Sequence, residues 1–186
     1  MDVQEAICKR RSVRDYTDHP VDKATVRSLI QAATFAPSAV NHQPWAFAVV
    51  QDKTLLKRYS DRAKVLFAKT TDLSSMPPHI RTMLADPAFD IFYNADTLII
   101  ICAKPIGQHP DWDCCLAGQN LMLAAHGMGL GTCPIGFAWP LLKQPDVKRE
   151  LNIPPEFDPV LPIIVGYPTK PPPAVPRNDP EILCWR

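Results

Sequence analysis

Two short stretches near the N-terminus carry the residue types that can bind an anionic ligand. The first, residues 10–16, reads Arg-Arg-Ser-Val-Arg-Asp-Tyr, and the second, residues 36–45, reads Ala-Pro-Ser-Ala-Val-Asn-His-Gln-Pro-Trp. Guanidinium groups present planar arrays of N–H donors that match phosphate oxygens, and charge-assisted hydrogen bonds are about twice as strong as neutral ones. This chemistry indicates an anion site, with arginines on a phosphate and loop amides on the rest of the ligand.

The residues that fit the phosphate best lie at the start of the first stretch. Arg10, Arg11 and Ser12 supply enough donors for one face of a phosphomonoester. Arg177, which lies within a proline-rich tail, is placed to close the other face. On their own these residues predict an anion site and no particular ligand.

One helix must connect and position the two stretches. Val26, Leu29, Ile30 and Ala33 recur with the i, i+3, i+4, i+7 spacing of an amphipathic helix. Asp22 suits the N-cap position, and a proline at residue 37 ends the helix. The two polar stretches are therefore expected to form two walls of a ligand site.

The remaining helices and strands are predicted from hydrophobic runs and from the residues that bound them. Residues 97–103 form a continuous β-branched run, which is typical of a strand covered on both faces. Residues 112–126 are apolar almost all round, which predicts a central buried helix. Further helices are expected at 3–9, 53–69, 80–84 and 141–151, with strands at 45–50 and 161–167 and a short, interrupted strand or loop at 132–137. Pro162 is expected at a sheet edge or at the entry of its strand. Helices and strands do not alternate strictly, so we predict an α+β fold with a central sheet in one domain, residues 1–186.

Composition excludes several classes of function. Hydrophobic residues make up 46% of the chain, charged residues 21%, and the net charge is +1. Such a balance does not favour binding to nucleic acid or to a membrane surface. The N-terminal residues are acidic and polar where a secretory signal would be basic and apolar, and the run at 98–103 is too short to span a bilayer. We expect a cytoplasmic protein.

The cysteines and several short motifs carry no catalytic signal. None of the six cysteines lies in a Cys-x-x-Cys pair or at zinc-ligand spacing, so buried free thiols and no metal site are expected. The glycines at 127, 129 and 131 end a helix, whereas a dinucleotide-binding loop would open one. There is also no Gly-x-Ser-x-Gly elbow of a serine hydrolase.

The C-terminal residues 168–186 have a different character. Six prolines between Pro168 and Pro180 force this segment to run extended. It ends in Ile-Leu-Cys-Trp at residues 182–185, and exposure of each large apolar side chain costs about 1.5–3 kcal/mol. We therefore expect an extended arm that packs on a partner subunit.

Taken together, the motifs resemble the FMN-dependent nitroreductase family. The similarity rests on Arg-Arg-Ser-x-Arg-x-Tyr near the start, Ala-Pro-Ser-x-x-Asn-x-Gln-Pro-Trp about twenty residues later, and Pro-Ile-Gly at 134–136. It implies a mostly antiparallel central sheet flanked by helices, and a homodimer with FMN at the interface.

The resemblance also implies a role for each site residue. Arg10, Arg11, Ser12 and Arg177 would hold the phosphate, and Arg14 would lie near the pyrimidine side of the flavin ring. The loop residues Pro37, Ser38, Ala39 and Asn41 would reach the flavin of the other subunit. The segment Pro134, Ile135 and Gly136 would direct a backbone N–H at flavin N5. No side chain would act as acid or base, so no catalytic residue is expected.

The reaction implied is a ping-pong transfer of hydride from NAD(P)H through flavin N5 to a nitroaromatic, a quinone or a similar acceptor. Two alternatives stay open. One is a non-enzymatic flavin-binding sensor or carrier. The other is a flavoenzyme of the same fold with another reaction, such as dehalogenation or azole oxidation.

Overall fold

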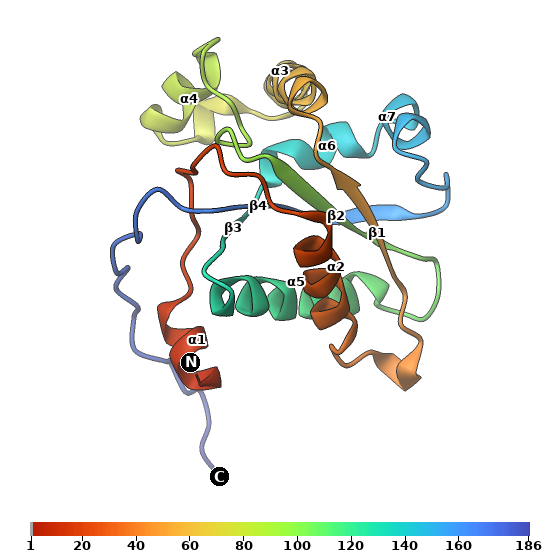
Figure 1. Ribbon diagram of the computed structural model, residues 1–186, viewed down its shortest axis with the longest axis vertical. Coiled ribbons are helices and arrows are strands. Elements are labelled where there is room, and N and C mark those ends of the chain that lie inside the picture. The colour runs from red at the N-terminus through yellow and green to blue at the C-terminus, as the bar shows by residue number, and fades with distance from the viewer. Residues whose placement is uncertain (1) are drawn as a thin grey trace.

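The protein is built on a four-stranded sheet in which every neighbouring pair is antiparallel. In this computed structural model, which describes residues 2–186, the strand order is β1-β2-β4-β3 (Figure 1). The strands are β1 (Trp45–Val50), β2 (Thr97–Ala103), β3 (Gly131–Pro134) and β4 (Asp158–Gly166). The predicted α+β class with a central antiparallel sheet is therefore confirmed.

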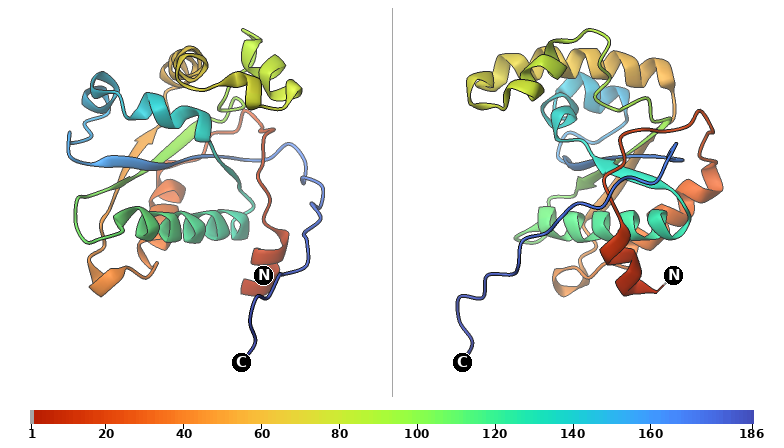
Figure 2. Two further views of the ribbon diagram at one scale, coloured as in Figure 1. Left: turned by 180° about the vertical axis from the view of Figure 1, so that it is seen from behind. Right: turned by 90° about the vertical axis from the view of Figure 1, so that its left-hand side faces the viewer.

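Helices cover both faces of this sheet and form three layers, as Figures 1 and 2 show. On one side lie α3 (Lys53–Thr70), α4 (Pro78–Ala85), α6 (Trp139–Leu142) and α7 (Pro145–Glu150). On the other side lie α5 (Pro110–Gly127) and α2 (Lys23–Thr34), with α1 (Val3–Lys9) beside the end of α5. Asp22 caps α2, as predicted, because its carboxylate accepts a hydrogen bond from the Thr25 N–H at 2.8 Å.

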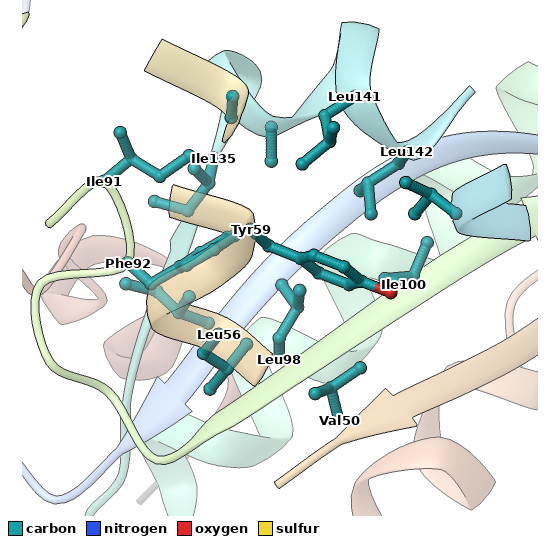
Figure 3. Close-up of a cluster of buried hydrophobic side chains, with 14 of the residues drawn as sticks. Val50, Leu56, Tyr59, Ile91, Phe92, Leu98, Ile100, Ile135, Leu141 and Leu142 are labelled. Atoms are coloured by element: carbon teal, nitrogen blue, oxygen red, sulfur yellow. The ribbon is translucent and has the colours of Figure 1, made fainter. Parts of the chain in front are cut away.

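Strand β2 divides its side chains between two hydrophobic cores, as a fully buried strand must. Leu98 and Ile100 point into the core under α3, and Ile99 and Ile101 point into the core under α5. Figure 3 shows the first core, where the ring of Tyr59 on α3 lies among strand and helix side chains. All seven residues of β2 are buried, which confirms the strand covered on both faces.

The helix predicted at 141–151 is wrong in one respect, because the chain forms two short helices there. Helix α6 ends at Leu142, and α7 starts at Pro145. Proline restricts the residue before it to extended conformations, and Gln144 has ψ 135°. The apolar spacing across this break matches a helix, but Pro145 interrupts it.

The position expected for Pro162, at a sheet edge or a strand entry, is also wrong. Pro162 lies inside β4, which pairs with β2 on one side and β3 on the other. Its carbonyl accepts from the Ile135 N–H at 2.9 Å on the β3 side, just beyond the end of β3. A residue of an antiparallel strand directs its N and O to the same side. Proline has no backbone N–H, and at Pro162 this group would face the β3 side of the strand. Because β3 has already ended at Pro134, no hydrogen bond of the sheet is lost there.

Helix α5 is buried on one flank and exposed on the other, which corrects the expectation of a fully buried helix. Cys114, Ala117 and Leu121 are completely buried, whereas 63% of Trp112 and 46% of Leu116 are exposed. The exposed flank carries apolar residues that a single chain leaves uncovered.

The cysteines are free, as expected, but they are not all buried. Cys102, Cys114 and Cys133 are buried, and Cys8, Cys115 and Cys184 are exposed. Between residues 2 and 186, no group of three or more His, Cys, Asp or Glu side chains is placed to hold a metal ion. Within the same residues, no helix has the length and apolar character needed to cross a bilayer.

The C-terminal segment from residue 171 onwards has no regular secondary structure and runs away from the body of the protein (Figure 2). Near its end, 89% of Leu183 and 87% of Trp185 are exposed. The extended conformation agrees with the prediction from its prolines.

Candidate functional site

The arginine-rich segment 10–16 runs along the edge of the sheet. Ser12 pairs with Thr132 of β3 in a parallel bridge, and the Val13 N–H donates to the Thr132 carbonyl at 3.0 Å. Tyr16 forms an antiparallel bridge with Pro168, at the start of the arm. The segment is thus held between an edge strand and the C-terminal arm, which fixes the backbone that carries the arginines.

Two glycines allow the segment 10–16 to lie close to the strands β3 and β4. A Cβ at Gly131 would lie 2.6 Å from a methyl group of Val13, and a Cβ at Gly166 would lie 2.7 Å from the Tyr16 ring. Carbon atoms do not approach this closely without displacement. Glycine at 131 and 166 therefore lets the segment lie flat against the sheet edge.

Positive charge gathers at a cavity of about 550 Å³ beside this segment. Lys9, Arg10, Arg11 and Lys170 line it. Burial lowers the pKa of Arg10, and the positive charges of Arg177 and Arg11 lower it further. Of these cations only Lys9 forms a salt bridge within residues 2–186, with the half-buried Glu5. The arginines crowd together without a carboxylate to offset their repulsion, so a bound anion would stabilise this arrangement.

Arg11 also has a structural contact. Its Nη1 donates to the carbonyl of Cys8 at 2.6 Å and to that of Arg10 at 2.8 Å, next to the end of α1. Its Nε is buried and has no hydrogen-bond partner among the described residues. The guanidinium thus satisfies carbonyls beside the helix end and retains a donor that the protein does not use.

A second cavity, of about 340 Å³, lies further along the same segment. Arg14, Phe67, Tyr93 and residues 133–137 line it, and the rings of Phe67 and Phe137 meet edge to face at 5.0 Å. Aromatic walls with one cation suit a flat, electron-accepting ring.

We call this second cavity the ring-side cavity. Its backbone geometry identifies one N–H group that can donate a hydrogen bond to a ligand. The Ile135 N–H already donates to the Pro162 carbonyl, which leaves the Gly136 N–H for a ligand. A Cβ at Gly136 would meet no atom within 4 Å, so the space beside this backbone is open. A ligand can approach Gly136 directly.

The loop at 37–43 is held in a strained conformation. Val40, Asn41 and Gln43 all have positive φ, at 44°, 57° and 48°. The Ser38 hydroxyl accepts from the Gln43 N–H at 3.0 Å, and 85% of Val40 is exposed. Strained backbone of this kind is concentrated at binding sites, where the surrounding structure maintains it.

The loop and the arginines lie at opposite ends of α5 (Figure 1). The Ala39 N–H donates to Asp113 at the start of α5, at 3.3 Å. His126, at the other end, has its pKa lowered by burial and then by the charges of Arg10 and Arg11. Because a helix rises about 1.5 Å per residue, these two ends are about 20 Å apart. The prediction that the two stretches of one chain form two walls of a single site is therefore wrong.

Several residues at these cavities were missed from the sequence. Lys170 precedes the run of prolines and adds a cation to the larger cavity. Asp113 is buried and holds the 37–43 loop. Tyr93 faces Arg14, and no periodic pattern marks it.

Comparison with known proteins agrees with this architecture. The family model described as "Nitroreductase family" matches residues 7–167. A protein of Methanothermobacter thermautotrophicus, named "Putative NADH dehydrogenase/NAD(P)H nitroreductase", is 30% identical over 185 residues, which cover 97% of this chain and 85% of that protein. An iodotyrosine deiodinase of Thermotoga neapolitana is 26% identical over 178 residues, covering 92% and 91%.

A solved structure extends the similarity to three dimensions. The nitroreductase of Bacteroides fragilis, crystallised with bound FMN, superposes with a TM-score of 0.83 at 25% identity. The superposition covers 100% of this chain and 98% of that one. Fold, sequence and family model agree over most of the chain, which therefore belongs to the nitroreductase family.

Proposed function

We propose that this protein is an FMN-dependent oxidoreductase that works as a homodimer with NAD(P)H as reductant. The observation that carries the proposal is the pair Arg10 and Arg11, which line one cavity and form no salt bridge with a carboxylate among residues 2–186. A phosphomonoester supplies the missing negative charge. The relative of known structure binds FMN, whose phosphate and flat ring suit the two cavities along the segment 10–16.

In this proposal the larger cavity receives the phosphate. Arg10 and Arg11 line this cavity from the edge of the sheet. Ser12 and Arg177 are not among its lining residues, and their assignment to the phosphate rests on the family resemblance. Both guanidinium groups can donate charge-assisted hydrogen bonds to a phosphate. Charge-assisted hydrogen bonds of this kind contribute about 1.5–3 kcal/mol each.

The ring-side cavity receives the flavin ring, flanked by Pro134, Ile135 and Gly136. Bound FMN supplies a group that takes up two electrons with a hydride and then gives them up to a second substrate. Arg14 places a positive charge where reduction of the flavin develops negative charge. The Gly136 N–H offers a donor at the ring, because the Ile135 N–H is already used.

A second chain completes each site. In a two-fold dimer with antiparallel α5 helices, the 37–43 loop of one chain lies beside the arginines of the other. This brings Pro37, Ser38, Ala39 and Asn41 to the flavin bound by the partner. The exposed apolar flank of α5 would be covered in such a dimer, as expected for a surface of this kind.

The extended arm, residues 168–186, packs on the partner subunit in the same proposal. The apolar side chains at its end, residues 182–185, are then buried against the partner and shielded from water. Arg177 lies within this arm, so docking of the arm and binding of phosphate would support each other. Residues 1–186 act as one domain, and the use of NAD(P)H suits a cytoplasmic location.

The function is tested by anaerobic reduction. Purified protein loaded with FMN is mixed with NADH or NADPH, and the flavin absorbance is followed before and after an electron acceptor is added. We expect bleaching by at least one nicotinamide and return of the colour with a nitroaromatic or a quinone. Bound flavin that neither nicotinamide reduces would contradict the proposal and would favour a flavin carrier or sensor.

Reductive dehalogenation is a second candidate, because one relative is named an iodotyrosine deiodinase. The same reoxidation experiment separates the two reactions. Return of colour with iodotyrosine and release of iodide would assign dehalogenation. Return of colour with nitroaromatics or quinones, but not with iodotyrosine, would assign the first reaction.

A further inference from the structure

The turn between α4 and β2 presents Tyr93 to the ring-side cavity in a conformation that large side chains rarely adopt. Tyr93 has φ 54° and Asn94 has φ 56°. A non-glycine residue with a large side chain in this region is an outlier, and such residues are concentrated at functional sites. The chain therefore holds the Tyr93 ring at this cavity against a local preference.

Asp90 holds the turn from within. Its carboxylate accepts hydrogen bonds from the N–H groups of Phe92 at 3.0 Å and Asn94 at 2.9 Å. Its carbonyl accepts from the Tyr93 N–H at 2.9 Å. Three hydrogen bonds to one residue thus fix the backbone on both sides of Tyr93.

Helix α3 anchors the same turn from outside. Lys64 Nζ donates to the Phe89 carbonyl at 2.7 Å and to two further carbonyls of the turn at 3.2 Å. The Ser60 hydroxyl accepts from the Ile91 N–H at 3.0 Å. Ile91 and Phe92 are completely buried in the core shown in Figure 3. Tyr93 consequently stands on a rigid support.

The Tyr93 ring faces the guanidinium group of Arg14. The Arg14 Cζ atom lies 5.9 Å from the ring centroid, within the range of a cation–π interaction. The Phe89 ring meets Tyr93 edge-on at 5.5 Å and so fixes its plane. Arg14 is exposed and forms no salt bridge within residues 2–186, so the aromatic face restricts a side chain that would otherwise be mobile.

Tyr93 is also suited to remain neutral. Burial raises the pKa of its phenol, although the neighbouring Arg14 charge acts in the opposite direction. A neutral phenol does not neutralise Arg14. The ring can therefore hold the cation in place while leaving its full charge available to a ligand.

We propose that Tyr93 is a positioning residue that holds the Arg14 guanidinium at the flavin and thereby raises the reduction potential of bound FMN. The inference rests on the proposed function, since it requires FMN in the ring-side cavity. A cation fixed before reduction stabilises the negative charge of reduced flavin without reorganisation. A mobile Arg14 would divide its time between this position and solvent.

The experiment compares Tyr93→Leu, which removes the ring, with Tyr93→Phe, which keeps it. The midpoint potential of bound FMN is measured against a reference dye, and the Kd of oxidised FMN is measured by fluorescence. For Tyr93→Leu we expect the Kd of reduced FMN to rise about tenfold relative to that of oxidised FMN. This corresponds to a midpoint about 30 mV lower for a two-electron couple. Tyr93→Phe should keep the wild-type potential.

A second variant, Tyr93→Asn, guards against misfolding, because asparagine tolerates positive φ. Each change is then repeated in an Arg14→Ala background. If Tyr93 acts through Arg14, removing its ring should change the potential no further there. An additional decrease in the double variant would overturn the inference.

The remaining outcomes separate this inference from the proposed function. Leu and Asn variants that bind FMN at the wild-type potential, while Arg14→Ala lowers it, would overturn the role of Tyr93 alone. A wild-type protein that does not bind FMN would overturn both.

Discussion

Replacement of Arg10 by alanine is expected to raise the Kd for FMN by about 10- to 150-fold. Arg10 is half-buried beside Arg177 and Arg11, and its loss removes about 1.5–3 kcal/mol of charge-assisted hydrogen bonding. The backbone N–H of residue 10 still donates to the Ala6 carbonyl in the variant, so α1 keeps its C-terminal cap. A fluorescence titration of the ligand-free protein with FMN measures the effect.

The matched control is Arg149→Ala, an exposed arginine of α7 that forms no salt bridge among the described residues. It should leave the Kd unchanged. The free energy of unfolding of ligand-free Arg10→Ala should not decrease, because the change relieves repulsion among like charges. An FMN affinity equal to that of the wild type would place the phosphate elsewhere.

Two defective chains are expected to restore one another when they form a heterodimer. One chain carries Arg10→Ala, and the other carries Ser38→Ala with Asn41→Gly in the 37–43 loop. Glycine at 41 removes the amide side chain and accepts the positive φ. Each homodimer has two damaged sites. If every site combines the arginines of one chain with the loop of the other, the heterodimer has one site with both defects and one intact site.

This complementation is measured with two different affinity tags. Heterodimers are purified through both tags and titrated at an FMN concentration between the Kd values of wild type and variants. We expect one FMN per heterodimer with wild-type affinity, and little binding by either homodimer. Heterodimers that bind as poorly as the homodimers would show that one chain supplies the whole site. The separation of about 20 Å along α5 favours the first result.

Much of the fold follows from the sequence because the strongest hydrophobic patterns are local. The β-branched run at 97–103 indicates a strand buried on both faces, and Asp22 marks the start of α2. The structure departs from the sequence-based predictions where local patterns do not determine the outcome. Pro162 occupies an inner strand because β3 is short, and Pro145 divides a segment whose apolar spacing suggests one helix.

The site is predictable from the sequence only in part. The arginine motif identifies an anion site, but it does not reveal that the 37–43 loop lies at the far end of α5. That separation depends on how α2 and α5 pack, which local spacing does not encode. The sequence does not reveal the role of Tyr93 for a similar reason. Its position results from hydrogen bonds of Asp90 and Lys64 to the backbone of an irregular turn, and such contacts leave no periodic signal.

The measurement that tests the central claim most directly is the visible absorption spectrum of the purified protein, before and after addition of FMN. If the two cavities form a flavin site shared between chains, the protein is yellow or becomes so with FMN. It then retains one FMN per chain as a dimer after gel filtration. A protein that remains colourless at an excess of FMN, as monomer or as dimer, would contradict the account.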